Sequence, residues 1–403
     1  MPKSRNLACL VLLAAAFTGL SAAPVQAAEV EFVRNATSEF DGYIASPTSR
    51  QQAWIQSHYR QMRGYPPFFD QALDWAPPTD FYQDLYALYP KLPADKKLID
   101  EHPDWILRDA SGKPLYIPWA CGGGTCPALA ADPANPAFRA EWVRRAAAKL
   151  AQGYAGVFID NVVLEMNVGN GQGQQVRPID RRTGAPMTDA AWSRYVAEFL
   201  EHIRSQLPTA RITHNVRWWL PRSDPFVRRA ALAADQIELE RGFNDKGLTG
   251  GGGTFGYTTF LRYIDWLHRL GKDVVVEPYL ANAREARYEV AGYFLTHRRG
   301  DRIATDYEAD PPTDEGRPQW WRGWNTNLGR ARGHRRMRGG LWRRKYSRAR
   351  VIVNPPDGRP RRIRFHRPKT NLAGKTGRRF RLGPREGDVF FRHRKVFRAA
   401  LRG

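Results

Sequence analysis

Four short apolar runs of the sequence end in acidic side chains. The most strongly apolar of them, GVFID at residues 156–160, closes at Asp160. The others close at Glu238 and Glu240 (QIELE), at Glu277 (VVVE) and at Asp306 (IATD). A carboxylate beside so many apolar residues is costly unless it is hydrogen-bonded or charge-paired, and such surroundings tune pKa values for catalysis. These acids are therefore the first candidates for a functional site.

Cleavage of a glycosidic bond requires two carboxyl groups that flank the bond. One donates a proton to the leaving oxygen, and the other attacks the sugar or activates a water molecule. We predict Asp160 and Glu240 as this catalytic pair, because Asp160 ends the most apolar run and Glu240 lies at a strand tip before a loop. Strand alternation directs Glu238 and Glu240 to the same side, so only depth distinguishes them. The alternative for Asp160 is a structural acid that caps the following loop.

Other polar and aromatic residues near these strand ends are candidates for substrate binding. Amide and imidazole groups can hydrogen-bond sugar hydroxyls or, alternatively, cap loops, and an indole offers a flat face for a sugar ring or packs in the core. Carboxylates near the catalytic pair can support it or bind substrate. The predicted substrate-binding residues are Glu238, Asn161, His214, Asn215, Glu277, Asp306 and Trp218.

The elements that must position these residues alternate between strands and helices. Between Glu29 and about Leu328, short β-type runs are separated by amphipathic helical stretches, which predicts repeated βα units around a parallel sheet. Helices are expected at residues 139–152, 190–207, 225–233 and 259–270, and weaker strands at 81–86 and 105–107. We therefore predict an α/β fold, a (β/α)8 TIM-type barrel over residues 29–328, whose strands bring their carboxyl ends to one face.

The last 76 residues differ sharply in charge from the rest of the chain. From Leu328 to Gly403 there are 26 Lys and Arg against 3 acids, which leaves 37 basic and 37 acidic residues before Leu328. The whole formal net charge of +23 therefore lies in this region. Short runs between Pro and Gly turns predict a small basic C-terminal β domain and tail at residues 329–403. Such charge attracts polyanions, so an acidic polymer is an expected partner.

The first 28 residues have the pattern of a secretory signal. Lys3 and Arg5 precede an apolar stretch and a small-residue cleavage context near Ala27. That stretch is too short to span a bilayer, and no later segment is apolar enough, so we expect a periplasmic or secreted chain without a transmembrane segment. In an oxidising compartment, Cys121 and Cys126, which flank a Gly-rich loop, are candidates for a disulfide. We expect neither a metal nor another cofactor.

The order of several stretches resembles hypothetical glycosyl hydrolase family 15, whose members are related to barrel glycosidases. The matching stretches are YQDLYALY (82–89), HPDWILRDASGKPL (102–115), DPANPAFRAEWV (132–143), GVFIDNV (156–162), ELERGF (238–243) and DEGRPQWWRGWNTNLG (314–329). The resemblance implies a barrel fold and sugar chemistry, and the VIVNPP run resembles the C-terminal β domain of such barrels. The Arg-rich C-terminal part departs from the family pattern.

These observations favour an exported glycoside hydrolase that acts on a polysaccharide or oligosaccharide. A hypothesis from a different class is a non-catalytic glycan-binding barrel that holds an acidic polymer through its basic C-terminal region. A third is a transglycosylase or lyase, which product analysis separates from a hydrolase. An esterase or zinc peptidase is disfavoured because the sequence has neither a Gly-x-Ser-x-Gly nor a His-Glu-x-x-His motif.

Overall fold

Eight parallel strands close into a barrel in the computed structural model, which describes residues 28–35, 44–280, 282–305 and 320–401. Around the barrel the strand order is β10-β11-β12-β13-β2-β3-β4-β7. The strands are β2 (Phe32–Asn35), β3 (Gln61–Gly64), β4 (Thr79–Asp84), β7 (Gly156–Asp160), β10 (Arg211–Asn215), β11 (Gln236–Glu240), β12 (Asp273–Glu277) and β13 (Arg302–Thr305). The predicted TIM-type barrel is thereby confirmed.

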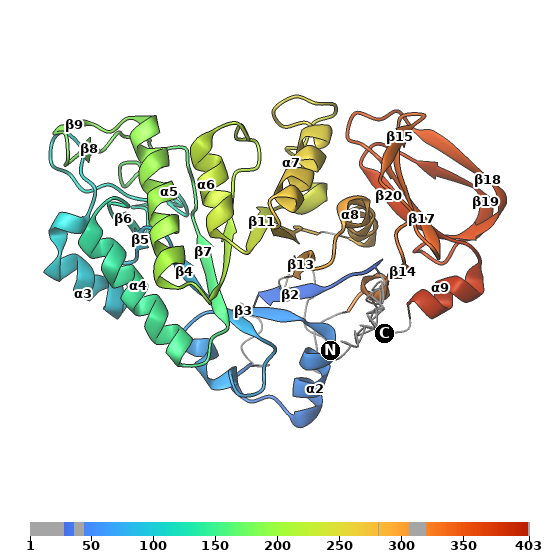
Figure 1. The fold of residues 1–403 in the computed structure, drawn as a ribbon, viewed down its shortest axis with the longest axis horizontal. Helices are drawn as coiled ribbons and strands as arrows, with labels where there is room; N and C mark the ends of the chain where they lie inside the picture. Colours follow the sequence, from blue (N-terminus) through green and yellow to red (C-terminus); the bar gives the residue numbers. More distant parts are fainter. Residues whose placement is uncertain (1–27, 36–43, 281, 306–319, 402–403) are drawn as a thin grey trace, which may run out of the picture.

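Helices cover the outside of the barrel (Figure 1). They are α2 (Ser49–His58), α3 (Pro93–Glu101), α4 (Pro136–Ala151), α5 (Asp189–Gln206), α6 (Pro225–Ala233), α7 (Tyr257–Arg269) and α8 (Ala283–Thr296). In α5, the residues that the helical periodicity marks as apolar, from Trp192 to Ile203, are buried, and Thr188 caps the first turn. The four helices predicted from the sequence lie within three residues of their observed bounds, because apolar spacing and capping residues are local features.

Both of the weaker strand predictions need correction. The strand expected at 81–86 begins and ends two residues earlier, as β4. The segment expected as a strand at 105–107 is instead the end of a 3-10 helix (Pro103–Trp105) followed by a single bridge between Ile106 and Ala131. It lies in the long connection between β4 and α4, where β5 (Ala87–Leu88) pairs with β6 (Leu129–Ala130). The apolar residues 105–107 are therefore buried by packing within this connection, and they do not form a strand of the barrel.

The interior of the barrel contains polar layers. Gln61 donates one hydrogen bond to Asp80 (2.6 Å) and one to Gln236 (3.1 Å), and Thr213 donates to the same Gln236 oxygen (2.8 Å). Arg211 pairs with Asp80 at 2.6 Å. These hydrogen bonds and this ion pair join side chains of four strands below the mouth, which fixes the alignment of the strands.

A six-stranded antiparallel sheet follows the barrel, which confirms the predicted C-terminal β domain. Its strands, in the order β15-β16-β17-β20-β18-β19, are β15 (Arg336–Arg338), β16 (Leu341–Lys345), β17 (Ala349–Asn354), β20 (Glu386–Phe391), β18 (Arg361–Thr370) and β19 (Thr376–Leu382). Helix α9 (Arg394–Ala400) follows, and β1 (Ala28–Glu29) pairs with β14 (Asn327–Gly329) in the linker.

Helix α8 lies between the barrel and this sheet (Figure 1). The contact is close at Gly387 of β20, where an added Cβ atom would lie 2.8 Å from the Cβ of Ala291. A larger residue at position 387 would push the sheet away from α8, since packed interiors leave no room for an extra carbon at that distance. The sheet therefore packs closely against helix α8 of the barrel through apolar contacts.

Candidate active site

Asp160 ends β7 at the mouth of the barrel and receives three hydrogen bonds. Tyr82 donates its hydroxyl to one carboxylate oxygen (2.6 Å). Asn215 donates its side-chain amide (2.5 Å) and Asn161 its backbone N–H (2.6 Å) to the other oxygen. The three donors come from β4, from β10 and from the residue after β7, so they hold the half-buried carboxylate in one orientation. Such an arrangement is complementary to a negative charge.

Asn161 connects Asp160 to a second acid, Asp84. Its backbone is left-handed (φ 56°), a conformation in which asparagine is several-fold enriched. This turn directs its side-chain amide to a carboxylate oxygen of Asp84, at 2.5 Å. The other Asp84 oxygen accepts the backbone N–H groups of Tyr86 (3.0 Å) and Ala87 (2.7 Å). Burial, and next the charge of Asp160, raise the pKa of Asp84 to about 7 despite these hydrogen bonds.

Deeper in the barrel than Asp160, a buried arginine of β3 contacts side chains of three other strands. The Arg63 guanidinium of β3 lies 3.2 Å from the ring centroid of Phe158 and makes a two-point ion pair with Glu238 of β11. It also lies 3.8 Å from Glu277 of β12. Burial lowers the pKa of Arg63, but the charges of Glu238 and Glu277 outweigh it and raise the pKa above its ordinary value. Burial raises the pKa of Glu238, and Arg63 opposes that shift.

The contacts of Arg63 establish which acids share a level. Phe158 and Glu238 lie in one interior layer, because both touch the same guanidinium. Side chains that point into a barrel recur at every second residue, and residues of alternate strands form layers. The next inward positions toward the mouth are therefore Asp160 on β7 and Glu240 on β11, which share the layer above.

Glu240 is the more exposed member of this layer. Its carboxylate accepts a hydrogen bond from the hydroxyl of Tyr279 (2.6 Å), and on the neighbouring strand Glu277 is its register partner. Glu238 and Glu240 do lie on the same side of β11, and Glu238 is the deeper of the two. Because Glu238 is engaged by Arg63, Glu240 is the β11 acid that is open to a ligand in the mouth.

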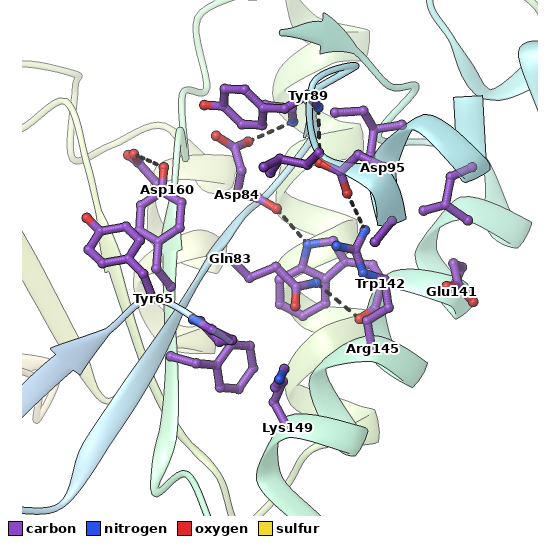
Figure 2. A pocket seen from close by; sticks show the side chains of 18 of the residues that line it. Tyr65, Gln83, Asp84, Tyr89, Asp95, Glu141, Trp142, Arg145, Lys149 and Asp160 are labelled. Carbon is purple, nitrogen blue, oxygen red and sulfur yellow. Dashed lines mark hydrogen bonds and ion pairs between the residues drawn. The ribbon is translucent and has the colours of Figure 1, made fainter. Parts of the chain in front are cut away.

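A cavity of about 800 Å³ opens beside Asp160 (Figure 2). Tyr65 and Tyr82 stack at a centroid distance of 4.8 Å along one wall, and Tyr65 remains 37% exposed. Figure 2 shows Asp160 and Tyr65 on one side of β4, and Trp142 and Lys149 of α4 on the other. Exposed aromatic faces next to a carboxylate suit the apolar face and the hydroxyl groups of a sugar.

The structure does not bring every predicted substrate-binding residue to the mouth. His214 is fully buried outside the barrel interior, where its ring nitrogens meet the carbonyl oxygens of Asn215 (2.8 Å) and Ala230 (3.1 Å). Burial lowers its pKa. Trp218 is 4% exposed and packs edge-on against Phe260, so its ring faces cannot receive a sugar. Asp306 lies outside the described residues.

The remaining predicted residues lie around the mouth. Asn161 and Asn215 contact Asp160 directly, and the backbone N–H of Val162 donates to the Asn215 side chain at 3.1 Å, which fixes that amide. Glu277 lies beside Arg63, and Glu238 pairs with it. The Asn215 side chain and the Asn161 backbone N–H therefore position the Asp160 carboxylate, while the two glutamates neutralise the buried arginine.

Asp84, Tyr82, Tyr65 and Arg63 are site residues that our sequence reasoning missed. Asp84 is, like Asp160, an acid at the end of a barrel strand, but its strand TDFYQD is not an apolar run. Extending that strand to residue 86 hid its acidic end. For Arg63 and the two tyrosines, the sequence holds no comparable indication, because their partners lie on other strands.

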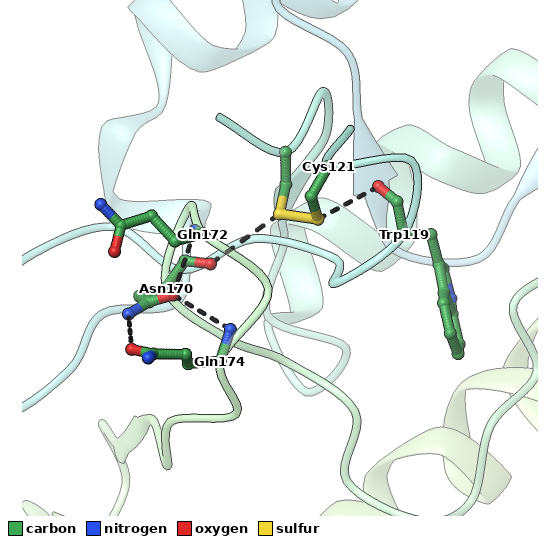
Figure 3. Close-up of a disulfide and its surroundings, with 6 residues drawn as sticks. Trp119, Cys121, Asn170, Gln172 and Gln174 are labelled. Carbon is green, nitrogen blue, oxygen red and sulfur yellow. Dashed lines mark hydrogen bonds between the residues drawn. A yellow bond between two sulfur atoms is a disulfide. The ribbon is translucent and has the colours of Figure 1, made fainter. Parts of the chain in front are cut away.

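A disulfide between Cys121 and Cys126 closes a small loop in the connection between β4 and α4 (Figure 3). The backbone N–H of Cys126 donates to the carbonyl of Gly171 at 2.7 Å, which ties this loop to the connection after β7. Trp119, two residues before the bridge, is 49% exposed. The disulfide therefore joins two of the loops that surround the barrel mouth.

Within the described ranges, no three His, Cys, Asp or Glu side chains form a group suited to hold a metal ion. None of the helices described is both long and apolar enough to cross a bilayer.

Comparison with known proteins identifies the family and the fold. The sequence model of hypothetical glycosyl hydrolase family 15 matches residues 80–350, more than half of the chain. No curated protein matches the chain. An α-amylase from Lactobacillus plantarum is similar in structure, with a TM-score of 0.50 and 10% identity over 89% of this chain and 98% of the amylase.

Two further structures are also similar. The α-glucosyl transfer enzyme XgtA has a TM-score of 0.50 and 10% identity, over 90% of this chain and 98% of that chain. The glycoside hydrolase domain of PelA from Pseudomonas aeruginosa has a TM-score of 0.39 and 15% identity, over 70% of this chain and 95% of that chain. At such low identity the amylase and XgtA establish a shared barrel fold, and the functional assignment rests on the family match.

Proposed function

We propose that this chain, which belongs to hypothetical glycosyl hydrolase family 15, is an exported enzyme that cleaves glycosidic bonds in a polysaccharide or oligosaccharide through Asp160 and Glu240. Family membership makes it a glycoside hydrolase. The two-carboxylate mechanism, the substrate class and export are the proposal. The mechanism is supported by the contacts of Arg63 with Phe158 and Glu238, from which strand alternation puts Asp160 and Glu240 in the next interior layer toward the mouth.

The surroundings of each carboxyl group suggest its role. Asp160 is held in one orientation by three donors, which suits the carboxylate that acts on the anomeric carbon, directly or through a water molecule. Glu240 has one observed donor, Tyr279, and is exposed. It therefore suits the proton donor to the leaving oxygen, which must meet substrate at the open side of the site.

Export is supported by the signal-like pattern of the first 28 residues, which lie almost wholly outside the described part of the chain, and by the disulfide. Disulfides persist in oxidising compartments and are rare in the cytosol. We expect the cysteine pair to be oxidised when the protein is isolated from the periplasm or the medium, as mass spectrometry after thiol alkylation would detect. Recovery of the chain with its first 28 residues intact, in the cytosol, would contradict export.

Digestion of a glycan library tests the activity. Wild type should release products, whereas Asp160→Asn and Glu240→Gln should each lower turnover by roughly 10²–10⁴-fold, the usual contribution of a general acid or base. Matched control variants are Asp104→Asn and Glu101→Gln, two exposed acids that do not line the cavity beside Asp160. Full activity in either site variant, with its fold intact by circular dichroism, would refute that residue's role.

The chemical form of the products separates the reaction classes. Hydrolysis yields a new reducing end with water incorporated, transglycosylation yields a longer oligosaccharide, and a lyase yields an unsaturated sugar. Mass spectrometry of the products in ¹⁸O-labelled water distinguishes the three. We expect ¹⁸O at the new reducing end, and unsaturated or only elongated products would overturn the hydrolytic mechanism.

A second function is favoured by the basic C-terminal sheet, namely retention of the enzyme on an acidic polymer. The sheet region carries the entire net charge of +23, while the barrel region is balanced. This binding function is compatible with catalysis, because the sheet and the barrel mouth are formed by different elements.

A further inference from the structure

Strands β18 and β19 carry a grid of four arginines on one face. Arg362 is the register partner of Arg381, and Arg364 is the register partner of Arg379. All four side chains are exposed. Between them along the strands, Ile363 and its register partner Phe380 are buried on the opposite face, so the alternation of the hairpin is complete. Like charges that lie directly opposite one another on a sheet are destabilising.

The acids of the C-terminal region do not neutralise this grid. Asp388 is buried and accepts hydrogen bonds from Asn371 (2.8 Å) and from the backbone N–H of Leu372 (3.0 Å). Glu386 accepts the backbone N–H of Gly383 (2.7 Å) and lies 3.5 Å from Arg284 of the barrel.

The third acid, Asp357, lies against the backbone of Gly250, in a barrel loop. The observed contacts of all three acids of residues 328–401 are therefore with groups other than the four arginines of β18 and β19. Four cationic groups remain gathered on that face without an acid of the same sheet between them. A gathered positive surface of this kind is favourable when an anion binds to it.

We propose that this arginine face is a binding site for an anionic polysaccharide, a polymer whose sugars carry carboxylate or sulfate groups. It deepens the proposed function, on which it rests, by naming a partner of the same enzyme. A groove of about 510 Å³ runs among Arg362, Arg364, Arg379 and Arg381, with Lys375 at its side. Guanidinium groups bind carboxylate and sulfate oxygens through paired N–H donors.

The spacing of the grid suits a linear polymer. Residues two apart on a strand are separated by roughly 6.5–7 Å, and directly opposed residues have Cβ atoms about 5 Å apart. Two rows of cations at that spacing can hold anionic groups on successive sugars. The binding is then multivalent along the chain, and each contact can be weak while the polymer stays attached.

The chemistry of the face favours a polysaccharide over nucleic acid or a membrane. The exposed large hydrophobic side chains of the described residues all lie outside β18 and β19. Single-stranded nucleic acids bind platforms on which aromatic rings stack with bases, and membrane-surface elements insert apolar side chains. The arginine face offers neither, and the family to which the chain belongs acts on sugars.

The test is a binding measurement on the full chain. Polygalacturonate is the probe, Asp160→Asn is the background so that polymer is not consumed, and affinity is followed by calorimetry at low and at physiological salt. The site variant is R362Q/R364Q/R379Q/R381Q. The matched control, R60Q/R228Q/R262Q/R299Q, removes the same charge from exposed arginines of the barrel.

We expect the site variant to bind polygalacturonate about tenfold more weakly or worse, and the control to change by less than about threefold, because contact charges act over roughly 8–10 Å at these salt concentrations. Binding should also weaken as salt rises. If both variants bind polygalacturonate equally weakly, the binding depends on net charge in general, and the proposed site is refuted. Tighter binding of duplex DNA or of phosphatidylserine vesicles than of polygalacturonate would overturn the choice of partner.

Two further measurements keep the outcome decisive. If the fourfold variant does not fold, as judged by its melting temperature, the pair R364Q/R379Q replaces it, and unchanged affinity in that folded pair refutes the site. Turnover of a short neutral oligosaccharide, if one is found as a substrate, should be the same in the site variant and in the wild type. We expect the site variant to lose polygalacturonate binding and to keep turnover. If the wild type binds polygalacturonate but turns over no glycan, that result contradicts the proposed enzymatic activity and leaves the binding site supported.

Discussion

Asp84 and Asp160 are register partners on adjacent parallel strands, β4 and β7. They are the terminal residues of these strands, so two carboxyl groups meet at one edge of the barrel mouth. Asn161 bridges them, because its side-chain amide donates to Asp84 and its backbone N–H donates to Asp160. Because Asp84 is buried and next to a second acid, its pKa is raised to about 7, and it changes charge near neutrality.

Asp84 should impose a pH dependence on catalysis. When pH rises through about 7, Asp84 ionises and places a second negative charge beside Asp160 and Asn161. We expect kcat/KM to fall across that range in the wild type, and we expect Asp84→Asn to remove this fall. The full pH profile of kcat/KM is the measurement. An unchanged profile in Asp84→Asn would show that another group sets the alkaline limit.

The hydroxyl of Tyr82 should contribute to turnover by holding Asp160. Tyr82→Phe removes one donor and keeps the stacked ring beside Tyr65. We expect kcat to fall by roughly 10- to 150-fold, since a hydrogen bond to a charged group contributes roughly 1.5–3 kcal/mol, with KM nearly unchanged. Tyr154→Phe, whose hydroxyl donates to Asp70 away from the mouth, is the control. A rise in KM without a fall in kcat would mean that Tyr82 binds substrate instead.

Substitution of Arg63 should lower the unfolding free energy of the barrel more than substitution of an exposed arginine. Arg63→Met leaves Glu238 charged in a buried place, which costs about 3–5 kcal/mol of unfolding free energy in comparable buried pairs. The double variant Arg63→Met/Glu238→Met should recover much of that loss. Urea unfolding measures both, with Arg144→Met on the surface of α4 as the control. Equal stability of Arg63→Met and the control would refute a structural ion pair.

Glu289 of α8 should make stability depend on pH through the loop that follows Glu240. Its carboxylate accepts the backbone N–H groups of Phe243 (2.9 Å) and Asn244 (3.1 Å). Burial raises the pKa of Glu289 to about 8, despite these two hydrogen bonds. The stability that it contributes is therefore complete below its unfolded pKa of about 4.3 and is lost as pH rises through about 8.

Glu289→Gln keeps an oxygen acceptor but removes the ionisation. Relative to wild type, its unfolding free energy should rise between pH 5 and pH 9 by about 4 kcal/mol, since the wild type loses about 1.4 kcal/mol for each pH unit between pH 5 and the raised pKa of about 8. Glu289→Ala removes the acceptor as well and should lower turnover by loosening the Glu240 loop. Unfolding at the two pH values separates these effects, and parallel stability curves for Glu289→Gln and wild type would contradict the raised pKa.

The amino-acid sequence by itself determined the features that depend on neighbours along the chain. Apolar spacing and capping residues located the helices, and the run GVFID placed Asp160 at the end of a strand because such patterns are local. Alternation in QIELE also put Glu238 and Glu240 on one side of β11. The fold class followed from the repetition of these units, and the charge of the last 76 residues was a matter of composition.

Only the tertiary structure decided which side chains meet. Arg63 and Glu238 are 175 residues apart in sequence, and closure of the barrel brings them into contact. His214 faces outward because pairing with β7 and β11 sets the phase of its strand, which a five-residue run cannot fix by itself. Asp84 joined the site through its register with Asp160. The site therefore depends on strand pairing over long distances, whereas its individual acids depend on local pattern.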